Sequence, residues 1–261
     1  MLKSIIILCT VLVFCTCAGT DNSNKVSSSP AASASKGNKY WTSLPESGEL
    51  VFIGVSGSQI KQETEIAMAC EDAARKVSMY HGLLASYVSV QSIGSGFMDY
   101  YVDSDIWLDY DRDIEKYLDK LVFDPERDVV KIDGTVFVRF TYPASFPGKI
   151  TYPFARNPNG SPEWMNRPPR EIDGFMAGVG FARKQSRQRD TITKSSESAA
   201  AALVSQINSS MSSKEVSAVN EKTTVIQQQS IGKLSNFLVL EIWIDPESDA
   251  VWTLAIAKSA N

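Results

Sequence analysis

The chain of 261 residues has a globular composition, with 43% hydrophobic and 21% charged residues and a formal net charge of −4. These values exclude a wholly disordered or fibrous chain. The acidic balance disfavours general nucleic-acid binding, so we expect no nucleic-acid partner. One histidine and four cysteines leave little material for a metalloenzyme or a thiol–imidazole pair. We therefore expect no cofactor, no metal and no enzymatic activity.

The first sixteen residues have the pattern of an export signal. Met1, Leu2 and Lys3 carry one positive charge and precede an apolar run that ends at Phe14. About eleven residues in a helix span roughly half of a bilayer core, so the run is too short to cross a membrane. It predicts the hydrophobic region of a signal peptide. No other run of that length occurs in the sequence, so we expect an exported protein without a membrane-spanning segment.

Cys17 is the candidate lipidation site. Phe14 lies three positions before it and the small residue Thr16 lies directly before it, which loosely fits a bacterial lipoprotein signal. The alternative is an ordinary cleaved signal that happens to contain cysteine. Residues 17–39 are nearly free of large apolar side chains, which is typical of a flexible tether. We therefore expect a lipid-anchored cell-envelope protein, on the periplasmic side of the outer membrane, in which Cys70 is the remaining thiol.

Three short strings recur in the same order in the two halves of the chain. They are W-x-x-x-P at 41–45 and 164–168, an apolar segment ending in Gly-Val at 51–55 and 175–179, and D-P-E-x-D at 124–128 and 245–249. The nearly constant offset, about 120 residues, indicates a tandem duplication. Seven of the eleven prolines lie from Pro143 to Pro169, which predicts a connector that is neither helix nor central strand. The predicted modules are 40–142 and 163–261, joined by a Pro-rich connector at 143–162.

We predict an α+β fold in which each module packs one long helix on an antiparallel sheet. The expected order is strand, long helix, alternating strand, polar helical segment, and a closing pair of strands. In the first module, Ile66, Cys70, Ala73, Val77, Tyr80 and Leu84 form the helical stripe, the strand is 87–93 and the polar helix 111–121. In the second, the stripe is Ile192, Ala199, Leu203 and Ile207, the strand 211–219 and the polar helix 221–234. Gly54 should superpose on Gly178, and Asp124 on Asp245.

Several patterns resemble catalytic or metal sites but lack essential residues. G-V-S-G-S at 54–58 has Ser58 where a nucleophile elbow requires glycine, so we expect a tight turn there. Asp109, Asp111 and Asp113 have calcium-loop spacing, but the sixth and twelfth positions are not the required glycine and glutamate. His81 and Cys70 are about three helical turns apart and cannot meet on one helix. We interpret both as packing or surface residues.

The strings P-E-W-M-N-R-P-P and G-F-M-A-G-V-G-F-A, between 162 and 182, resemble the opening of the bacterial Lpp-twenty lipoprotein family. The closing segment 241–257 is also similar to that family. The resemblance is good over about residues 162–261 and fainter over 40–142. It implies a cell-envelope lipoprotein without a catalytic constellation, and some relatives are non-enzymatic parts of envelope or flagellar assemblies. The relaxed signal motif at Cys17 resembles those of spirochaetes.

Charge is unevenly distributed along the chain. Residues 99–120 are acidic and include Asp109, Asp111 and Asp113, whereas the segment 183–194 is basic and includes Arg183, Lys184, Arg187 and Arg189. Two solvated helix faces are one interpretation. The other is a complementary surface for self-association or for docking to envelope proteins. We therefore expect a structural or assembly component. The alternative is a periplasmic module that binds a small ligand or glycan through Trp164, Tyr152 and Phe154.

Overall fold

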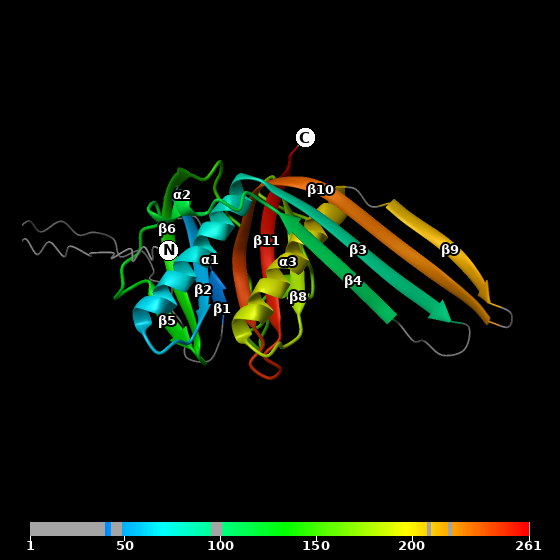
Figure 1. Cartoon of the computed structure of the whole chain (residues 1–261), viewed down its shortest axis with the longest axis horizontal. Helices are drawn as coiled ribbons and strands as arrows, with labels where there is room; N and C mark the ends of the chain where they lie inside the picture. The colour runs from blue at the N-terminus through cyan, green and yellow to red at the C-terminus, as the bar shows by residue number, and fades with distance from the viewer. Residues whose placement is uncertain (1–39, 43–48, 95–100, 208–209, 219–220, 261) are drawn as a thin grey trace, which may run out of the picture. The chain divides into compact units, whose positions relative to one another are not determined.

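The computed structural model describes residues 40–42, 49–94, 101–207, 210–218 and 221–260, all within one compact unit, Ala34–Asn261 (Figure 1). The fold is mixed α+β, as predicted. The elements are β1 Tyr40–Thr42, β2 Glu49–Gly57, α1 Gln62–His81, β3 Leu83–Gly94, β4 Tyr101–Asp109, α2 Glu115–Leu118, β5 Val129–Ile132, β6 Thr135–Ser145, the 3-10 turn η1 Glu163–Met165, β7 Glu171–Ile172, β8 Phe175–Ala182, α3 Gln188–Ile207, β9 Ser210–Ala218, β10 Glu221–Ile244 and β11 Val251–Ser259.

The strands form two antiparallel sheets. The small sheet has the order β2-β6-β5, and the large sheet has the order β4-β3-β10-β11-β8-β7, with β1 and β9 also paired to β10. The large sheet therefore contains β3 and β4 from before the Pro-rich connector as well as β8 to β11 from after it. The boundary between the sheets does not follow the predicted division of the chain into two modules.

Strand β10 is the element on which the large sheet is built. One edge of β10 pairs with β9 along 221–229 and with β11 along 234–244, and the other edge pairs with β3 along 223–234 and with β1 along 241–243. The prediction of a polar helix at 221–234 is therefore wrong. This segment is rich in β-branched residues and has a strand partner on both edges, which favours extended backbone. The predicted helix at 111–121 is reduced to the four residues of α2.

The two long helices lie where the sequence predicts them. α1 packs on β2 and β6, and α3 packs on β8, β10 and β11. Each helix approaches a strand closely at a glycine: a Cβ at Gly54 would lie 2.0 Å from the carbonyl oxygen of Ala69, and a Cβ at Gly180 would lie 2.0 Å from that of Ser195. Any side chain at these glycines would push the helix away from its sheet. α1 ends at His81, so Leu84 of the predicted stripe belongs to β3.

The first strand and helix of each half make the same local contacts. The amide of Val55 donates to Asp72 Oδ2 at 2.8 Å, and the amide of Phe181 donates to Ser198 Oγ at 3.3 Å. Before each helix, the amide of a glutamine donates to a side chain in the first helical turn: Gln59 to Glu65, and Gln185 to Thr191. Both helices have 20 residues. These contacts place Gly54 in the position of Gly180, two residues beyond the predicted Gly178.

The two D-P-E-x-D strings form the same turn but connect different elements. In each turn the fifth residue donates its amide to the carbonyl of the first: Asp128 to Asp124 at 2.8 Å and Asp249 to Asp245 at 2.9 Å. The second turn joins β10 to β11, as predicted. The first instead lies between an isolated bridge from Val122 to Thr141 and strand β5, which pairs with β6. The string therefore determines the turn, whereas the flanking residues determine its place in the sheet.

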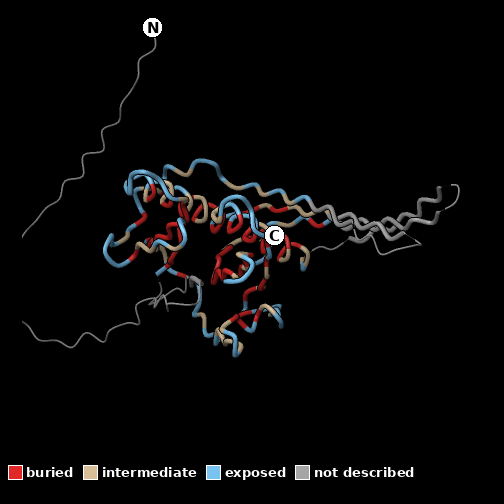
Figure 2. Tube along the Cα trace, turned by 90° about the horizontal axis from the view of Figure 1, so that it is seen from below, coloured by how far each residue is buried: buried red, intermediate tan, exposed pale blue. Residues whose placement is uncertain are grey.

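Two buried hydrophobic clusters stabilise the fold, and each draws on both halves of the chain. Figure 2 shows how buried and exposed residues are distributed along the chain. The first cluster includes Phe52, Val138, Leu240 and Ile256. The second includes Ile53, Phe137, Leu203 and Ile242. Consecutive residues of β2 point to opposite faces of its sheet, so the small sheet contributes to both clusters. Within the described residues, no helix has the length and apolarity needed to cross a membrane.

The contact at Gly54 gives a direct test of this packing. We expect Gly54→Ala to lower the free energy of unfolding by about 1–3 kcal/mol, because the new methyl group overlaps the α1 backbone. Gly57→Ala is the matched control, since a Cβ there meets nothing within 4 Å. Urea denaturation followed by circular dichroism measures both variants. Equal stability of the two would contradict the close approach of α1 to β2.

Candidate functional site: a groove between the two long helices

A groove of about 710 Å³ lies between α1 and α3 and is bounded by β4 and β10. Its floor is apolar and is formed by Val55, Met79, Ile192, Phe237 and Val239, all of which are buried. These residues come from four different elements, β2, α1, α3 and β10. The floor is therefore preformed by the core, and an occupant would contact a surface that is already packed.

Strand β4 forms one wall of the groove. Ile106, Trp107 and Leu108 all line the groove, and Tyr110 follows just beyond the strand. Successive side chains of a strand point to opposite faces, so a groove lined by three consecutive residues runs along the edge of the strand. Within the described residues, β4 pairs with β3 alone, on its other edge. Trp107 is 53% exposed, and its side chain alternates with those of Ile106 and Leu108, so it points to the other face of the sheet.

Charged side chains surround the groove, and most of them are already paired. Ion pairs join Arg75 to Glu71 and Lys194 to Glu197, at 3.4 and 3.5 Å. Arg112 donates to the carbonyl oxygen of Leu108, and its guanidinium carbon lies 4.2 Å from the centre of the Tyr110 ring. The half-buried Arg189 differs: among the described residues its guanidinium has no hydrogen-bond or ion-pair partner.

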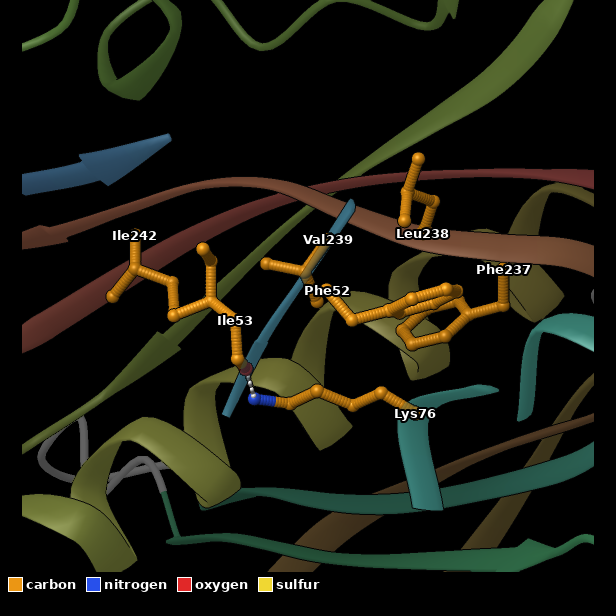
Figure 3. A pocket seen from close by; sticks show the side chains of 7 residues that line it. All are labelled: Phe52, Ile53, Lys76, Phe237, Leu238, Val239 and Ile242. Carbon is orange, nitrogen blue, oxygen red and sulfur yellow. Dashed lines mark hydrogen bonds between the residues drawn. The ribbon is translucent and has the colours of Figure 1, made fainter. Parts of the chain in front are cut away.

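Lys76 and Asp72 also line the groove. Both hydrogen-bond to backbone groups at the open edge of β2. Lys76 Nζ donates to the carbonyl oxygen of Ile53 at 2.6 Å (Figure 3) and to Asp72 Oδ2 at 2.8 Å. Asp72 in turn accepts the amide of Val55. Beside this pair, β2 and β10 enclose a cavity of only about 10 Å³ with apolar walls, which is too small and too apolar for a ligand. Lys76 and Asp72 therefore protect an edge strand and are not available to an occupant.

Only part of the predicted charged surface lies in the groove. Arg189 lines it, whereas Arg183, Lys184 and Arg187 are exposed outside it, and Lys184 pairs with Asp249 at 2.8 Å. The acidic residues Asp109, Asp111 and Asp113 are exposed and do not line it either. The structure thus brings the start of α3 to the end of β4, but among the described residues no ion pair joins the predicted basic and acidic segments. Lys116 hydrogen-bonds to Asp111 and lowers the pKa of that carboxyl.

The aromatic residues predicted to bind a small ligand are instead part of the core. Trp164 is fully buried, and its Nε1 donates to Glu241 Oε2 at 2.6 Å. Arg156 pairs with the same carboxylate. Burial raises the pKa of Glu241, while the Trp164 hydrogen bond and the Arg156 charge oppose that rise. Tyr152 and Phe154 are half-buried against each other. Arg156 of the Pro-rich connector and Trp164, just after it, thus both contact β10 at Glu241, and Trp164 has no free face for a ligand.

His81 and Cys70 have packing roles. The His81 ring stacks on Tyr117 at 5.6 Å, and its Nε2 lies 3.4 Å from the Tyr142 hydroxyl. Partial burial lowers the His81 pKa, and Lys120 and Lys116 lower it further. Burial raises the pKa of the Cys70 thiol, which packs against the core and stays protonated at neutral pH. Cys17 lies outside the described residues.

Comparison with protein-family models, with curated proteins and with solved structures gives no match to this chain. The groove is therefore interpreted from its own residues. Sequence analysis did not single out Trp107 or the edge of β4. The apolar run Ile106-Trp107-Leu108 is flanked by aspartates, and this pattern is the sequence signal for the wall of the groove. Within the described residues, no cluster of three or more histidine, cysteine, aspartate or glutamate side chains has metal-binding geometry.

Proposed function

We propose that this protein is a non-enzymatic, lipid-anchored component of a bacterial cell-envelope assembly and that its groove docks an extended polypeptide. The resemblance of 162–261 to the Lpp-twenty lipoproteins and the signal motif at Cys17 support the envelope location. Two or more acyl chains on Cys17 would hold the chain at the membrane, because a single chain binds only marginally.

One observation supports the docking role: the groove runs along the edge of β4 that has no strand partner in the described residues. An incoming strand could pair with that edge through backbone hydrogen bonds while its side chains enter the groove, a common mode of peptide recognition. Trp107, Tyr110 and Arg189 supply the residue types that dominate protein–protein contacts. The guanidinium of Arg189, which has no partner among the described residues, would donate to carbonyl or carboxylate oxygens of the occupant.

We also propose that the chain arose by tandem duplication of a strand–helix unit. The matching contacts of Val55 with Asp72 and of Phe181 with Ser198 support this origin. The first strand of each half also pairs with the last: the order β2-β6-β5 parallels β8-β11-β10. In this interpretation, the penultimate strand of the second copy became longer and is now β10. Because β10 pairs with β1 and β3 of the first copy, the two copies now share one sheet.

A second candidate function is binding of a small ligand or glycan in the same groove. The apolar floor of the groove and the charged side chains around it favour this function, because small-ligand sites combine apolar walls with a few polar groups. Such a ligand would leave the mass of the protein nearly unchanged. A polypeptide partner would increase it.

The anchor is tested by Cys17→Ser in cells that express the full chain. We expect the variant to leave the detergent-soluble membrane fraction and appear in the aqueous fraction, because no acyl chain can be attached. Cys70→Ser serves as the control and should fractionate like the parent. A Cys17→Ser variant that still partitions into detergent would refute lipid anchoring at this residue.

The groove is tested by Arg189→Glu, with Arg187→Glu as a control of identical charge change outside the groove. We expect Arg189→Glu to weaken association roughly tenfold or more, because it replaces a free donor in the contact by an acceptor. Sedimentation of the detergent-extracted protein over a concentration series reports the mass of the complex. If both variants shift the association equally, the effect is one of net charge and the docking site lies elsewhere.

A further inference from the structure

The described part of the large sheet includes a ribbon of four strands with an open edge at each side, on β4 and on β9. Strands β3, β4, β9 and β10 run side by side in the order β4-β3-β10-β9 (Figure 1). Within the described residues, β4 pairs only with β3, and β9 pairs only with β10. Open edges of this kind present rows of unpaired N–H and C=O groups that favour pairing with another strand.

The two edges match each other in length and direction. β4 and β9 each have nine residues. All three pairings within the ribbon are antiparallel. β4 and β9 therefore run in opposite directions, and a second copy in the same orientation would bring its β9 antiparallel to β4. The sheet would then continue from one molecule to the next without a change of pattern.

Charge distinguishes this arrangement from the two symmetric ones. Pairing the strands centre to centre places Asp105 opposite Lys214 of the second copy. The same centred pairing of β4 with β4 places Asp105 opposite Asp105, and that of β9 with β9 places Lys214 opposite Lys214. Like charges directly opposite each other destabilise a strand pair, and opposite charges stabilise it. Asp105 is exposed and carries no ion pair in the described residues, so it is available.

The groove supports the same arrangement. In the centred antiparallel pairing, Met211 of the incoming strand lies opposite Leu108, at the part of β4 that forms the groove wall. The start of the incoming strand would therefore lie beside the part of β4 that forms the groove wall.

We propose that β4 of one copy pairs with β9 of the next, head to tail and with Asp105 opposite Lys214, so that the large sheets join into a ring or filament. Contacts that use two different surfaces of a chain produce such open or closed series. This proposal rests on the proposed docking function and names a second copy of the chain as the partner.

Disulfide trapping tests the proposal in the full-length, detergent-extracted protein. The background carries Cys70→Ser, which introduces the residue type that α3 has in the matching position, Ser196. Asp105→Cys and Lys214→Cys are combined in one chain and oxidised. Opposite residues of an antiparallel pair have Cα atoms about 4.5–5.5 Å apart, within disulfide reach. We expect a ladder of dimers, trimers and higher multimers on a non-reducing gel.

The controls decide between arrangements. The oxidised background chain gives the contribution of the native cysteines. Each single cysteine variant should give no additional product, and a dimer from either one would indicate symmetric pairing and overturn the proposal. Asp105→Cys with Ser213→Cys places the thiols on opposite faces, so a ladder from this pair would overturn the register. Absence of a ladder from every pair would overturn the head-to-tail contact.

Charge exchange gives a second measurement that does not depend on cysteine chemistry. We expect Asp105→Lys to reduce the sedimenting mass, and Asp105→Lys combined with Lys214→Asp to restore it. If the double variant remains dissociated, the proposed pairing is wrong. If Arg189→Glu still dissociates a complex when no ladder forms, the groove docks a different polypeptide. The proposed function then stands while this inference fails.

Discussion

The fold depends on the backbone hydrogen bonding of β10. A strand of 24 residues exposes two long rows of donors and acceptors, and each row must find partners. β10 finds them in β9 and β11 on one edge and in β3 and β1 on the other. Because β1 and β3 precede the Pro-rich connector and β9 and β11 follow it, this single strand joins the two halves. Both hydrophobic clusters also contain residues from the two halves of the chain.

Local patterns were readable from the sequence, whereas long-range pairing was not. The stripes at Ala73 and Val77 and at Ala199 and Leu203 gave the two long helices, and the apolar alternation around 245–249 gave the β10–β11 hairpin. The segment 221–234 was misread because its polar residues satisfy helical spacing as readily as strand alternation. Its extended form depends on β3, a partner more than a hundred residues away. The burial of Trp164 likewise depends on Glu241, which lies 77 residues further along the chain.

The candidate site is a consequence of unsatisfied strand edges. The edge of β2 is protected by Lys76 and Asp72, and that of β10 between 235 and 240 lies beside the same pair. The edge of β4 has no comparable protection in the described residues, and the groove with Trp107 and Arg189 runs along it. A protected edge indicates a boundary of the fold, and an open edge with an aromatic residue beside it indicates a contact. Charge spacing alone could not separate Arg189 from its exposed neighbour Arg187.

The central claim is that β10 and the shared clusters make the two halves one cooperative unit. Native-state hydrogen exchange by mass spectrometry tests it on the parent and on Gly54→Ala, a change at the contact of β2 with α1 and with Phe140 of β6. Amides of β6 and of β11 report separately on the small and the large sheet. We expect the substitution to lower the opening free energy of both sets by the same amount. A loss of protection confined to β2 and β6, with β11 unchanged, would show two independent modules and contradict this account.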